Sequence, residues 1–337
     1  MKIEQLLEKI VNNKNLSLDE AKFLMEQMME GKVSEVQMAA ILVGLRMKGE
    51  SENEILGFIK AMREKMTKVK TKGLVIDTCG TGGDKSGSFN ISTAAALVVA
   101  GAGVKVAKHG NRSVSSNCGS ADVLEELGVN IMLEPKQTVE VLNKAGIVFL
   151  FAPLYHPAMK NIALVRQALK LRTVFNFLGP LVNPAEVKRQ LLGVANLAVA
   201  KKLVKVAKRL AYKHLMLVCS KDGLDEISIS APSHIFEIKG NKVVKKIIKP
   251  EDFGIKRVSK KYLLGGKVEE NARIIKQILV GKKGPQREVV ILNSGTALYV
   301  SGKVRTINQG IKLAQESIDK GKAKETLNKL IRISNNF

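Results

Sequence analysis

The stretch 74–122 constrains the fold of this chain more than any other part of the sequence. A short apolar run at its start leads into the tight turn Gly-Thr-Gly-Gly-Asp at 80–84. Further on, a small-residue apolar segment, 94–102, is followed by a second apolar step, 104–107, and by the polar run 108–116. This order predicts strand, glycine loop, helix, strand, polar loop and helix. Two such units in succession are typical of an open α/β sheet.

Both loops of this stretch carry groups suited to a phosphorylated ligand. Glycines let the backbone adopt positive φ and approach a ligand closely, while Ser92 and Thr93 suit a helix N-terminus, where free N–H groups favour an anion. A glycine turn alone is common between a strand and a helix. The second loop, however, carries Lys, His, Asn, Arg and three serines, which packing alone does not require. Since parallel strands end at one edge of a sheet, we expect the two loops to form one anion site.

The residues before this stretch follow a helical pattern. Apolar side chains recur three and four positions apart, and a lysine-rich linker that ends in glycine follows them. Capping boxes that open three of four short helices begin at Ser17, Ser34 and Ser51. We therefore predict a small helical domain, residues 1–70, whose remaining apolar surface is available for a dimer interface. Helices around 158–185 are expected to pack with it.

The remainder, residues 71–337, alternates strands with helices and predicts a larger α/β domain with a mainly parallel central sheet. Strands are predicted at 129–132, 147–151, 190–195, 214–219 and 288–292, and a hairpin at 235–248. Helices are predicted at 135–144, 158–169, 198–211, 267–280, 294–301 and 307–333. Helices are expected to cover both faces of such a sheet.

The formal net charge of +24 raises the question of a nucleic-acid partner. Only 12 of the 55 basic residues are arginine, the lysines are scattered, and aromatic residues make up 4% of the chain. A surface that reads bases would be expected to cluster arginine with interleaved aromatics. We interpret most of the charge as a solvated lysine surface that also attracts anionic substrates. Binding of nucleic acid is therefore not expected.

Neither a membrane span nor an export signal is predicted. The longest apolar run, 94–104, is too short and too rich in alanine and glycine to cross a bilayer. The N-terminus is charged and amphipathic, without a signal-peptide core. Cys79, Cys118 and Cys219 lack Cys-x-x-Cys spacing, which argues against a disulfide framework or a zinc site. We expect a cytoplasmic protein.

Asp225 and Glu226 follow the predicted strand 214–219 and a glycine. Adjacent carboxylates suit Mg²⁺, a hard cation that takes oxygen ligands and shares them with phosphates. Standing alone, two loop acids would more often be solvated, but beside a phosphate loop the metal interpretation is favoured. Mg²⁺ is thus the expected cofactor.

Two histidines and an arginine are further candidates. His109 and His156 fit orienting or stacking roles better than acid–base catalysis, and neither a Ser/His/Asp or Cys/His arrangement nor metal-ligand histidine spacing is readable. Arg166 is a candidate carboxylate clamp because its planar guanidinium pairs bidentately, although helical arginines usually lie at the surface. Arg172 and Asn176 fit a loop-holding role as well as a ligand-binding one.

Motifs in a fixed order extend along almost the whole chain. They are Gly-Thr-Gly-Gly-Asp (80–84), Phe-Asn-Ile-Ser-Thr (89–93), Lys-His-Gly-Asn-Arg-Ser-Val-Ser-Ser (108–116), Gly-Ser-Ala-Asp-Val-Leu-Glu (119–125), Phe-Ala-Pro and His-Pro-Ala-Met-Lys (within 151–160), Arg-Thr-Val-Phe-Asn-Phe-Leu-Gly-Pro-Leu-Val-Asn-Pro (172–184), Asp225-Glu226 and Asn-Ser-Gly-Thr-Ala-Leu-Tyr (293–299). In number and order they resemble the anthranilate phosphoribosyltransferase family. The resemblance implies a homodimer with a small helical domain and a larger α/β domain of the nucleoside phosphorylase and phosphoribosyltransferase type.

The resemblance also implies a reaction, in which the amine of anthranilate attacks C1 of phosphoribosyl pyrophosphate (PRPP) and releases pyrophosphate, in tryptophan biosynthesis. The residues implied to bind PRPP are Gly80, Gly83, Asp84, Ser88, Asn90, Ile91, Ser92, Thr93, Lys108, His109, Gly110, Asn111, Arg112, Ser113, Val114, Ser115, Ser116 and Ser120. Those implied to contact anthranilate are Gly80, Asn111, His156 and Arg166, with His109 also lining its channel. Mg²⁺ ligands would be Ser92, Asp225 and Glu226, and catalytic roles would fall to Lys108, His109, Asn111 and Arg166.

Two places depart from the family pattern. Lys85 stands where many relatives have glycine, and 169–171 replaces a frequent Gly-Val before Arg172. Neither change removes a ligand group. The chemistry agrees with the residues, because an aromatic amine is neutral at pH 7 and needs positioning more than deprotonation. Charge that grows on the leaving oxygens would be stabilised by Mg²⁺, Lys108 and loop N–H groups.

Two other functions remain as alternatives. A pyrimidine-nucleoside phosphorylase shares this architecture, but its phosphate loop is of the Lys-His-Ser-Thr-Gly-Gly type, whereas Lys108-His109 is followed here by Gly-Asn-Arg. A non-catalytic relative that binds nucleic acid would explain the charge. The intact glycine loop and Asp225-Glu226 argue against it.

Overall fold

The computed structural model describes residues 1–84, 86–113 and 118–337. Four short helices open the chain, namely α1 (Ile3–Val11), α2 (Leu18–Met29), α3 (Glu35–Lys48) and α4 (Glu52–Lys65). The capping boxes predicted at Ser17, Ser34 and Ser51 are all present. Each cap satisfies backbone N–H groups that a helix start otherwise leaves unpaired. Apolar faces of these helices, including the fully buried Phe58, meet in one bundle core.

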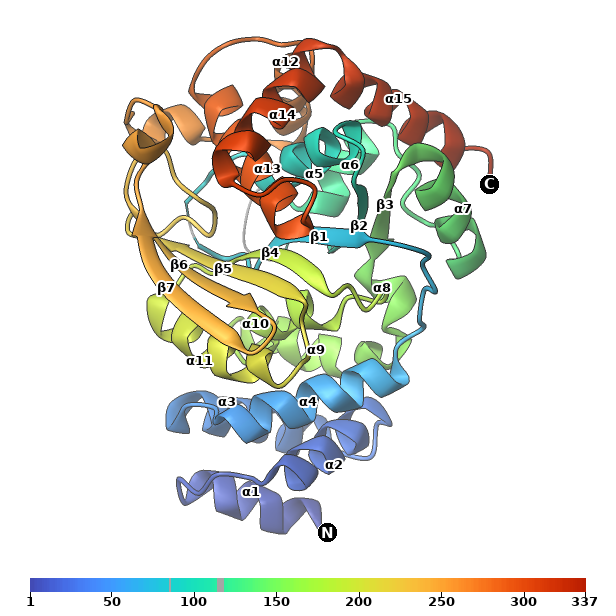
Figure 1. Ribbon diagram of the computed structural model, residues 1–337. Helices are drawn as coiled ribbons and strands as arrows, with labels where there is room; N and C mark the ends of the chain where they lie inside the picture. Colours follow the sequence, from blue (N-terminus) through green and yellow to red (C-terminus); the bar gives the residue numbers. More distant parts are fainter. Residues whose placement is uncertain (85, 114–117) are drawn as a thin grey trace.

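A seven-stranded sheet lies above this bundle (Figure 1). Its strands are β1 (Val75–Gly80), β2 (Lys105–Gly110), β3 (Ile147–Phe151), β4 (Arg189–Gly193), β5 (His214–Ser220), β6 (Ser233–Lys239) and β7 (Lys242–Ile248). The order is β3-β2-β1-β4-β5-β6-β7; the first five are parallel, and β6 and β7 form the antiparallel hairpin predicted from the sequence. The predicted fold class, a helical domain with a mainly parallel α/β domain, is confirmed.

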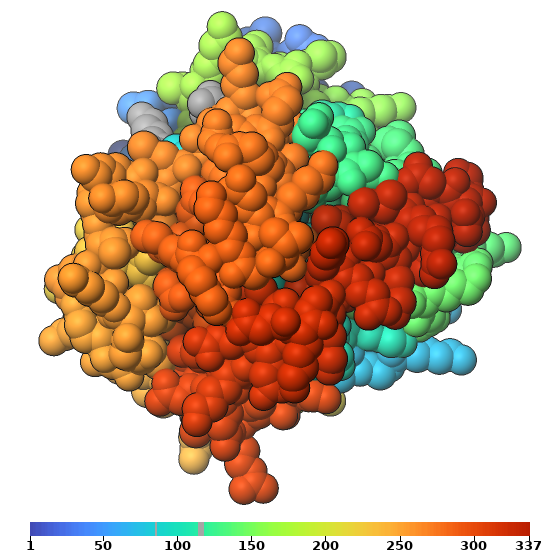
Figure 2. Space-filling model, turned by 90° about the horizontal axis from the view of Figure 1, so that it is seen from above, coloured from blue at the N-terminus to red at the C-terminus, as the bar shows by residue number. Residues whose placement is uncertain are grey.

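Helices cover both faces of the sheet. The face away from the bundle carries α5 (Ile91–Gly101), α6 (Ser120–Glu126), α12 (Val268–Leu279), α13 (Pro285–Ser301), α14 (Ile307–Asp319) and α15 (Lys322–Ser334). Figure 2 shows the C-terminal segments, orange to red, spread across this side of the molecule. The outer edge beside β3 carries α7 (Pro135–Ala145). Within the described part of the chain, no helix is both long and apolar enough to cross a membrane.

The face toward the bundle is covered by a second set of short helices. These are α8 (Ala152–Tyr155), α9 (Lys160–Leu169), α10 (Phe175–Leu178), the 3-10 turn η2 (Gly179–Val182) and α11 (Leu197–Lys208). In Figure 1 they lie between the sheet and α1–α4. Packing of α9 against α2 and α3 joins the bundle to this layer. One apolar core therefore runs from the bundle to the lower face of the sheet.

Three predicted elements are wrong. Residues 129–132 form no strand, and 288–292 lie inside α13 instead of a strand. A short apolar run such as Val289 to Leu292 fits a buried helix as well as a strand, and Pro285 at the first turn with Gly302 at the C-terminus bounds a helix here. The predicted helix 307–333 is two helices, because Gly321 adopts positive φ between α14 and α15.

Candidate active site

The carboxyl ends of the parallel strands meet at one edge of the sheet. Gly80 pairs with Gly193 across β1 and β4, and these two glycines let the loop after β5 lie directly on the strand ends. A Cβ on Gly80 would lie 2.2 Å from Asp225 Oδ2, and one on Gly193 would lie 1.4 Å from the Asp225 backbone oxygen. Only glycine permits this approach. The sequence thus places the loop that carries Asp225 and Glu226 against the glycine loop.

The glycine loop is held by that same carboxylate. Gly82 and Gly83 both have positive φ, 69° and 65°, and the Gly82 N–H donates to Asp225 Oδ2 at 2.8 Å. Asp84 completes the link, since its Oδ1 accepts from the Ser86 N–H at 3.0 Å and its Oδ2 accepts from the Asp225 N–H at 3.4 Å. Asp84 and Asp225 therefore both hold the start of the loop, and Glu226 is close enough to interact with their charges.

Burial and mutual repulsion disfavour ionisation of Asp225 and Glu226. Burial, with the nearby Asp84 carboxylate, raises the pKa of Asp225 to about 7. Burial and the Asp225 charge raise the pKa of Glu226 well above its ordinary value, and Lys108 opposes that rise. Two buried carboxyl groups in such a position suit a cation whose charge would lower both pKa values. Carboxylate oxygens are the donors that Mg²⁺ prefers, so this donor set fits the ion.

The described residues 1–84, 86–113 and 118–337 contain no group of three or more His, Cys, Asp or Glu side chains arranged to hold a metal ion. Asn293 of α13 holds the loop that carries Asp225 and Glu226, called the acidic loop below. Its side-chain amide accepts from Ile227 N–H at 3.0 Å and donates to Ile227 O at 2.9 Å.

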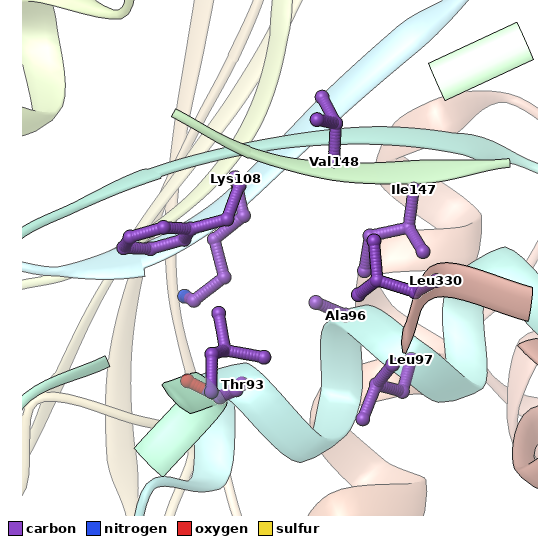
Figure 3. Close-up of a pocket in the computed structure, with 9 residues that line it drawn as sticks. Thr93, Ala96, Leu97, Lys108, Ile147, Val148 and Leu330 are labelled. Atoms are coloured by element: carbon purple, nitrogen blue, oxygen red, sulfur yellow. The ribbon is translucent and has the colours of Figure 1, made fainter. Parts of the chain in front are cut away.

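Lys108 lies between the two loops. Its ammonium donates to Thr78 O at 2.6 Å and to Ser92 Oγ at 3.2 Å, and the residue is 3% exposed. Figure 3 shows the side chain extending from β2 toward Thr93 at the start of α5. A cavity of about 10 Å³ beside it is lined by Thr93 and by apolar residues that include Ala96 and Leu330. This cavity has room for about one water and none for a substrate.

The start of α5 is held from a distant part of the chain. Asn90, the residue before the helix, donates its backbone N–H to Asn271 Oδ1 at 3.1 Å and its side-chain amide to Cys118 O at 3.3 Å. Asn271 of α12 is 1% exposed and donates in turn to Gly266 O and Lys267 O. Sequence reasoning missed this residue. An asparagine on the buried, apolar face of helix 267–280 was the available signal.

Asp122 of α6 holds the described residues on either side of 114–117. Its Oδ2 accepts from Ser113 N–H at 3.1 Å and from Gly119 N–H at 2.8 Å. The Arg112 guanidinium also turns toward this helix, where it pairs with Asp122 and Glu125. In this arrangement two carboxylates already neutralise the Arg112 charge. Gly110, Asn111 and Ser120 lie together, with Ser120 Oγ donating to Asn111 O at 3.4 Å; Val114, Ser115 and Ser116 lie outside the described residues.

His109 and His156 form a buried pair, with ring centroids 5.2 Å apart and a 46° angle between planes. Burial lowers the pKa of His109 to about 3 and that of His156 to about 4. Both rings are therefore neutral at pH 7. His109 Nδ1 lies 3.1 Å from Gly179 O, which makes Nδ1 the donor and leaves Nε2 as an acceptor.

Arg166 is apart from these clusters. It is half-buried on α9 with its guanidinium 5.1 Å from the centre of the Phe175 ring, and burial lowers its pKa. No carboxylate among the described residues pairs with it. Asn176 serves the local turn, since its Oδ1 accepts from Thr173 N–H at 2.9 Å. The structure thus groups the loop residues with Asp225 and Glu226, pairs the two histidines, and leaves Arg166 as a separate cation.

Comparisons with known proteins agree with this architecture. The glycosyl transferase family, helical bundle domain, matches residues 4–66, and the glycosyl transferase family, a/b domain, matches residues 72–324. The fold and the two-loop site thus define a glycosyl transferase of this bundle-plus-α/β class.

Individual relatives narrow the class. Anthranilate phosphoribosyltransferases from Methanobrevibacter smithii and Pelotomaculum thermopropionicum are each 48% identical to this chain and cover 99% of it, over 99% and 97% of their own lengths. The solved enzyme from Thermus thermophilus aligns with TM-score 0.91 and 37% identity over 98% of this chain and 99% of its own. The enzyme from Saccharomyces cerevisiae in complex with PRPP and Mg aligns with TM-score 0.92 and 26% identity over 99% and 98%. The chain belongs to the anthranilate phosphoribosyltransferase family.

Proposed function

We propose that this chain transfers the phosphoribosyl group of PRPP to the amine of anthranilate, giving N-(5-phosphoribosyl)anthranilate and pyrophosphate in tryptophan biosynthesis. The observation that carries the proposal is the junction of the glycine loop with the acidic loop, where Gly82 N–H and Asp225 Oδ2 are 2.8 Å apart. A buried ammonium, Lys108, lies next to it. Anion-binding N–H groups, a cation and paired acids are what a pyrophosphate with its metal ion requires.

In this proposal the PRPP phosphates bind along the two loops. Ser92 and Thr93 offer hydroxyls at the start of α5, which is the positive end of the helix dipole. Lys108 then faces the oxygens that gain negative charge when the bond from C1 to pyrophosphate breaks. The second loop from Gly110 to Ser120 takes the other phosphate, with Arg112 free to act only after it leaves Asp122 and Glu125.

Asp225 and Glu226 are proposed to hold Mg²⁺, with Ser92 as a further oxygen donor. Bound Mg²⁺ would supply charge neutralisation for the pyrophosphate. Support comes from the buried acid pair and from the yeast relative solved with PRPP and Mg. Asp84 holds the acidic loop through its contact with the Asp225 N–H.

Anthranilate is proposed to bind on the side of the sheet that faces the bundle. The Arg166 guanidinium would pair with its carboxylate, since the described residues give that cation no acid of their own. Neutral His109 and His156 can accept from the amine or stack against the ring without carrying charge. Asn111 and Gly80 would border the reacting amine. Attack then needs positioning more than a strong base.

One assay tests the function. Purified protein is mixed with anthranilate, PRPP and Mg²⁺, and loss of anthranilate fluorescence is followed while pyrophosphate is measured. We expect equal amounts of anthranilate consumed and pyrophosphate released. Phosphate-dependent cleavage of uridine or thymidine without use of anthranilate would instead establish a nucleoside phosphorylase.

A double variant tests the metal assignment. Asp225→Asn with Glu226→Gln keeps the side-chain shapes but removes both charges, so PRPP use should fall strongly and its dependence on Mg²⁺ should disappear. Binding of anthranilate should change much less. Wild-type activity across a Mg²⁺ titration would show that these acids do not hold the metal.

We also propose that residues 1–70 and 71–337 are the two domains and that two copies pair through the helical domain. The bundle exposes the apolar side chains of Val11, Val36 and Met47, which supports a dimer interface on this surface. Light scattering during gel filtration should give twice the 36.7 kDa chain mass. Val36→Lys with Met47→Glu should lower that mass toward one chain.

A further inference from the structure

Arg172 lies in the turn between α9 and α10, on the side of the sheet that faces the bundle, yet its side chain rests on the glycine loop. Its Nη2 donates to Gly82 O at 3.4 Å. A Cβ on Gly83 would lie only 2.1 Å from the same Nη2, so the guanidinium packs directly against the loop backbone. The contact joins residues 90 positions apart in the sequence. It is the point where the bundle side of the molecule reaches the phosphate loop.

This guanidinium lacks a strong partner. Arg172 is exposed, and no carboxylate in the described ranges 1–84, 86–113 and 118–337 lies within ion-pair distance of it. A carbonyl contact of 3.4 Å is long for a hydrogen bond. Arg112 offers the contrast, because Asp122 and Glu125 already neutralise it. Of these two arginines, only Arg172 has its charge free.

Two hydrogen bonds hold the backbone around Arg172 in place. Arg46 of α3 donates from Nη1 to Arg172 O at 2.6 Å, a charged hydrogen bond. Asn176 Oδ1 accepts from the next N–H, that of Thr173, at 2.9 Å. These two bonds hold the main chain while the guanidinium keeps its freedom to turn. The bundle thus presents a positioned cation at the loop.

We infer that Arg172 binds the pyrophosphate group of PRPP beside the glycine loop, an inference that rests on the proposed function. Its planar fork of N–H donors matches two phosphate oxygens at once. Because the guanidinium lies against the glycine-loop backbone, the loop and Arg172 would contact the same pyrophosphate. The bound substrate would then link the turn after α9 to the glycine loop.

The experiment compares Arg172→Ala with two matched variants. Arg172→Ala deletes the guanidinium but keeps the backbone oxygen that Arg46 holds, so the fold should be unchanged. We expect KM for PRPP to rise, and affinity for pyrophosphate measured by calorimetry with Mg²⁺ to fall, by about tenfold or more. KM for anthranilate should stay within about twofold, a factor that corresponds to well under the energy of one charged hydrogen bond. Arg172→Lys should recover part of the loss, because a point charge remains without the fork.

Controls separate this role from general electrostatics and from packing. Lys170→Asn removes one positive charge two residues away, at a position with φ of 47° that asparagine tolerates, and should leave both KM values unchanged. Arg46→Ala removes the anchor but keeps the guanidinium, and should weaken PRPP binding in the same direction by less.

Three results would overturn the inference: unchanged pyrophosphate affinity in a folded Arg172→Ala protein, a rise confined to KM for anthranilate, or an equal loss in Lys170→Asn. Failure of the proposed function looks different. In that case the wild type itself shows no transfer to anthranilate, while calorimetry with pyrophosphate still compares Arg172→Ala with wild type.

Discussion

Arg166 offers the clearest residue-scale test of the acceptor site. Its guanidinium lies 5.1 Å from the Phe175 ring centre and is paired with no carboxylate of the described chain. If it binds the anthranilate carboxylate, Arg166→Ala should lose about 1.5–3 kcal/mol, the scale of a hydrogen bond to a charged group. That corresponds to a roughly 10- to 150-fold fall in kcat/KM for anthranilate. Steady-state kinetics with each substrate varied in turn measures it.

The two arginines of this region then give opposite patterns. Arg166→Ala should lower kcat/KM for anthranilate and leave the KM for PRPP unchanged, and Arg166→Lys should recover only part of the loss. A folded variant with unchanged anthranilate kinetics would remove Arg166 from the site. Equal impairment toward both substrates, together with a lowered melting temperature, would assign it a structural role through Phe175.

Residue types indicated which parts of the chain meet at the candidate site, but they did not predict its individual contacts. Glycines 80–84 and the adjacent acids 225 and 226 indicated a phosphate loop and a cation site, and the structure brings them together. The bond between Asn90 and Asn271 and the contact between Arg172 and Gly82 span long sequence separations, so no local pattern specifies them. Arg112 shows the same limit, since its pairing with Glu125 depends on where α6 lies.

At the scale of elements, Glu237 ties the antiparallel hairpin to the rest of the sheet. This β6 carboxylate accepts from His214 Nε2 of β5 at 2.8 Å, Tyr299 OH of α13 at 2.6 Å and Lys246 of β7 at 3.3 Å. The bond with His214, followed by Tyr299 and Lys246, lowers the pKa of Glu237 to about 2 from 4.5. A lowered carboxyl pKa stabilises the fold above the unfolded value and loses that contribution as pH falls.

Glu237→Gln should therefore be less stable than wild type above about pH 4.5, because it lacks the charge. The difference should shrink as pH falls from 4.5 toward about 2, where wild-type Glu237 becomes protonated. Urea midpoints at constant ionic strength, taken from pH 7 to pH 3, measure it. The exposed Glu126→Gln should show no such pH trend. A stability difference between Glu237→Gln and wild type that stays constant with pH would mean that the substitution removes packing and not a charge interaction.

Element type was hardest to predict where burial is complete. Periodicity distinguishes helix from strand only when one face is polar, and nearly every residue of α13 is buried. The run at 288–292 therefore lost its helical signature. Amphipathic helices such as α12 and the hairpin of β6 and β7 each have a clear periodic pattern, and they were predicted closely.

Close helix contacts add another element-scale prediction. Gly310 of α14 faces Gly295 of α13, and a Cβ on Gly310 would lie 2.1 Å from Gly295 O. Alanine usually favours a helix over glycine by about 1 kcal/mol, but Gly310→Ala should instead destabilise by about 1–3 kcal/mol through overpacking. Denaturant unfolding measures this, with the exposed Lys312→Ala on the same helix as control. Any gain in stability for Gly310→Ala would contradict the contact.

At the scale of the whole molecule, the two predicted domains share their apolar interior. One core lies above the sheet, and the other joins the bundle to the lower face of the sheet. The lower core contains Met25 and Phe58 of the bundle together with Leu192 and Leu217 of the strands. Arg63 of α4 adds two hydrogen bonds to Leu181 O, at 2.9 and 2.8 Å. Loss of the bundle would therefore expose the apolar side of α9 and α11, the helices that cover the lower face of the sheet.

From this shared core we predict that bundle and sheet unfold together. Phe58 is fully buried, and Phe58→Ala should cost about 3–5 kcal/mol and lower the melting temperature by on the order of 5–10 °C. All four tyrosines, 155, 212, 262 and 299, lie outside the bundle, so tyrosine fluorescence reports on the α/β part alone. Far-UV circular dichroism reports on both parts. The two melting curves should coincide and shift together in Phe58→Ala, while the exposed Lys60→Ala on the same helix should shift neither. An unchanged tyrosine transition, with an earlier partial loss of helix signal, would mean that the bundle melts by itself and that the shared core does not couple the domains.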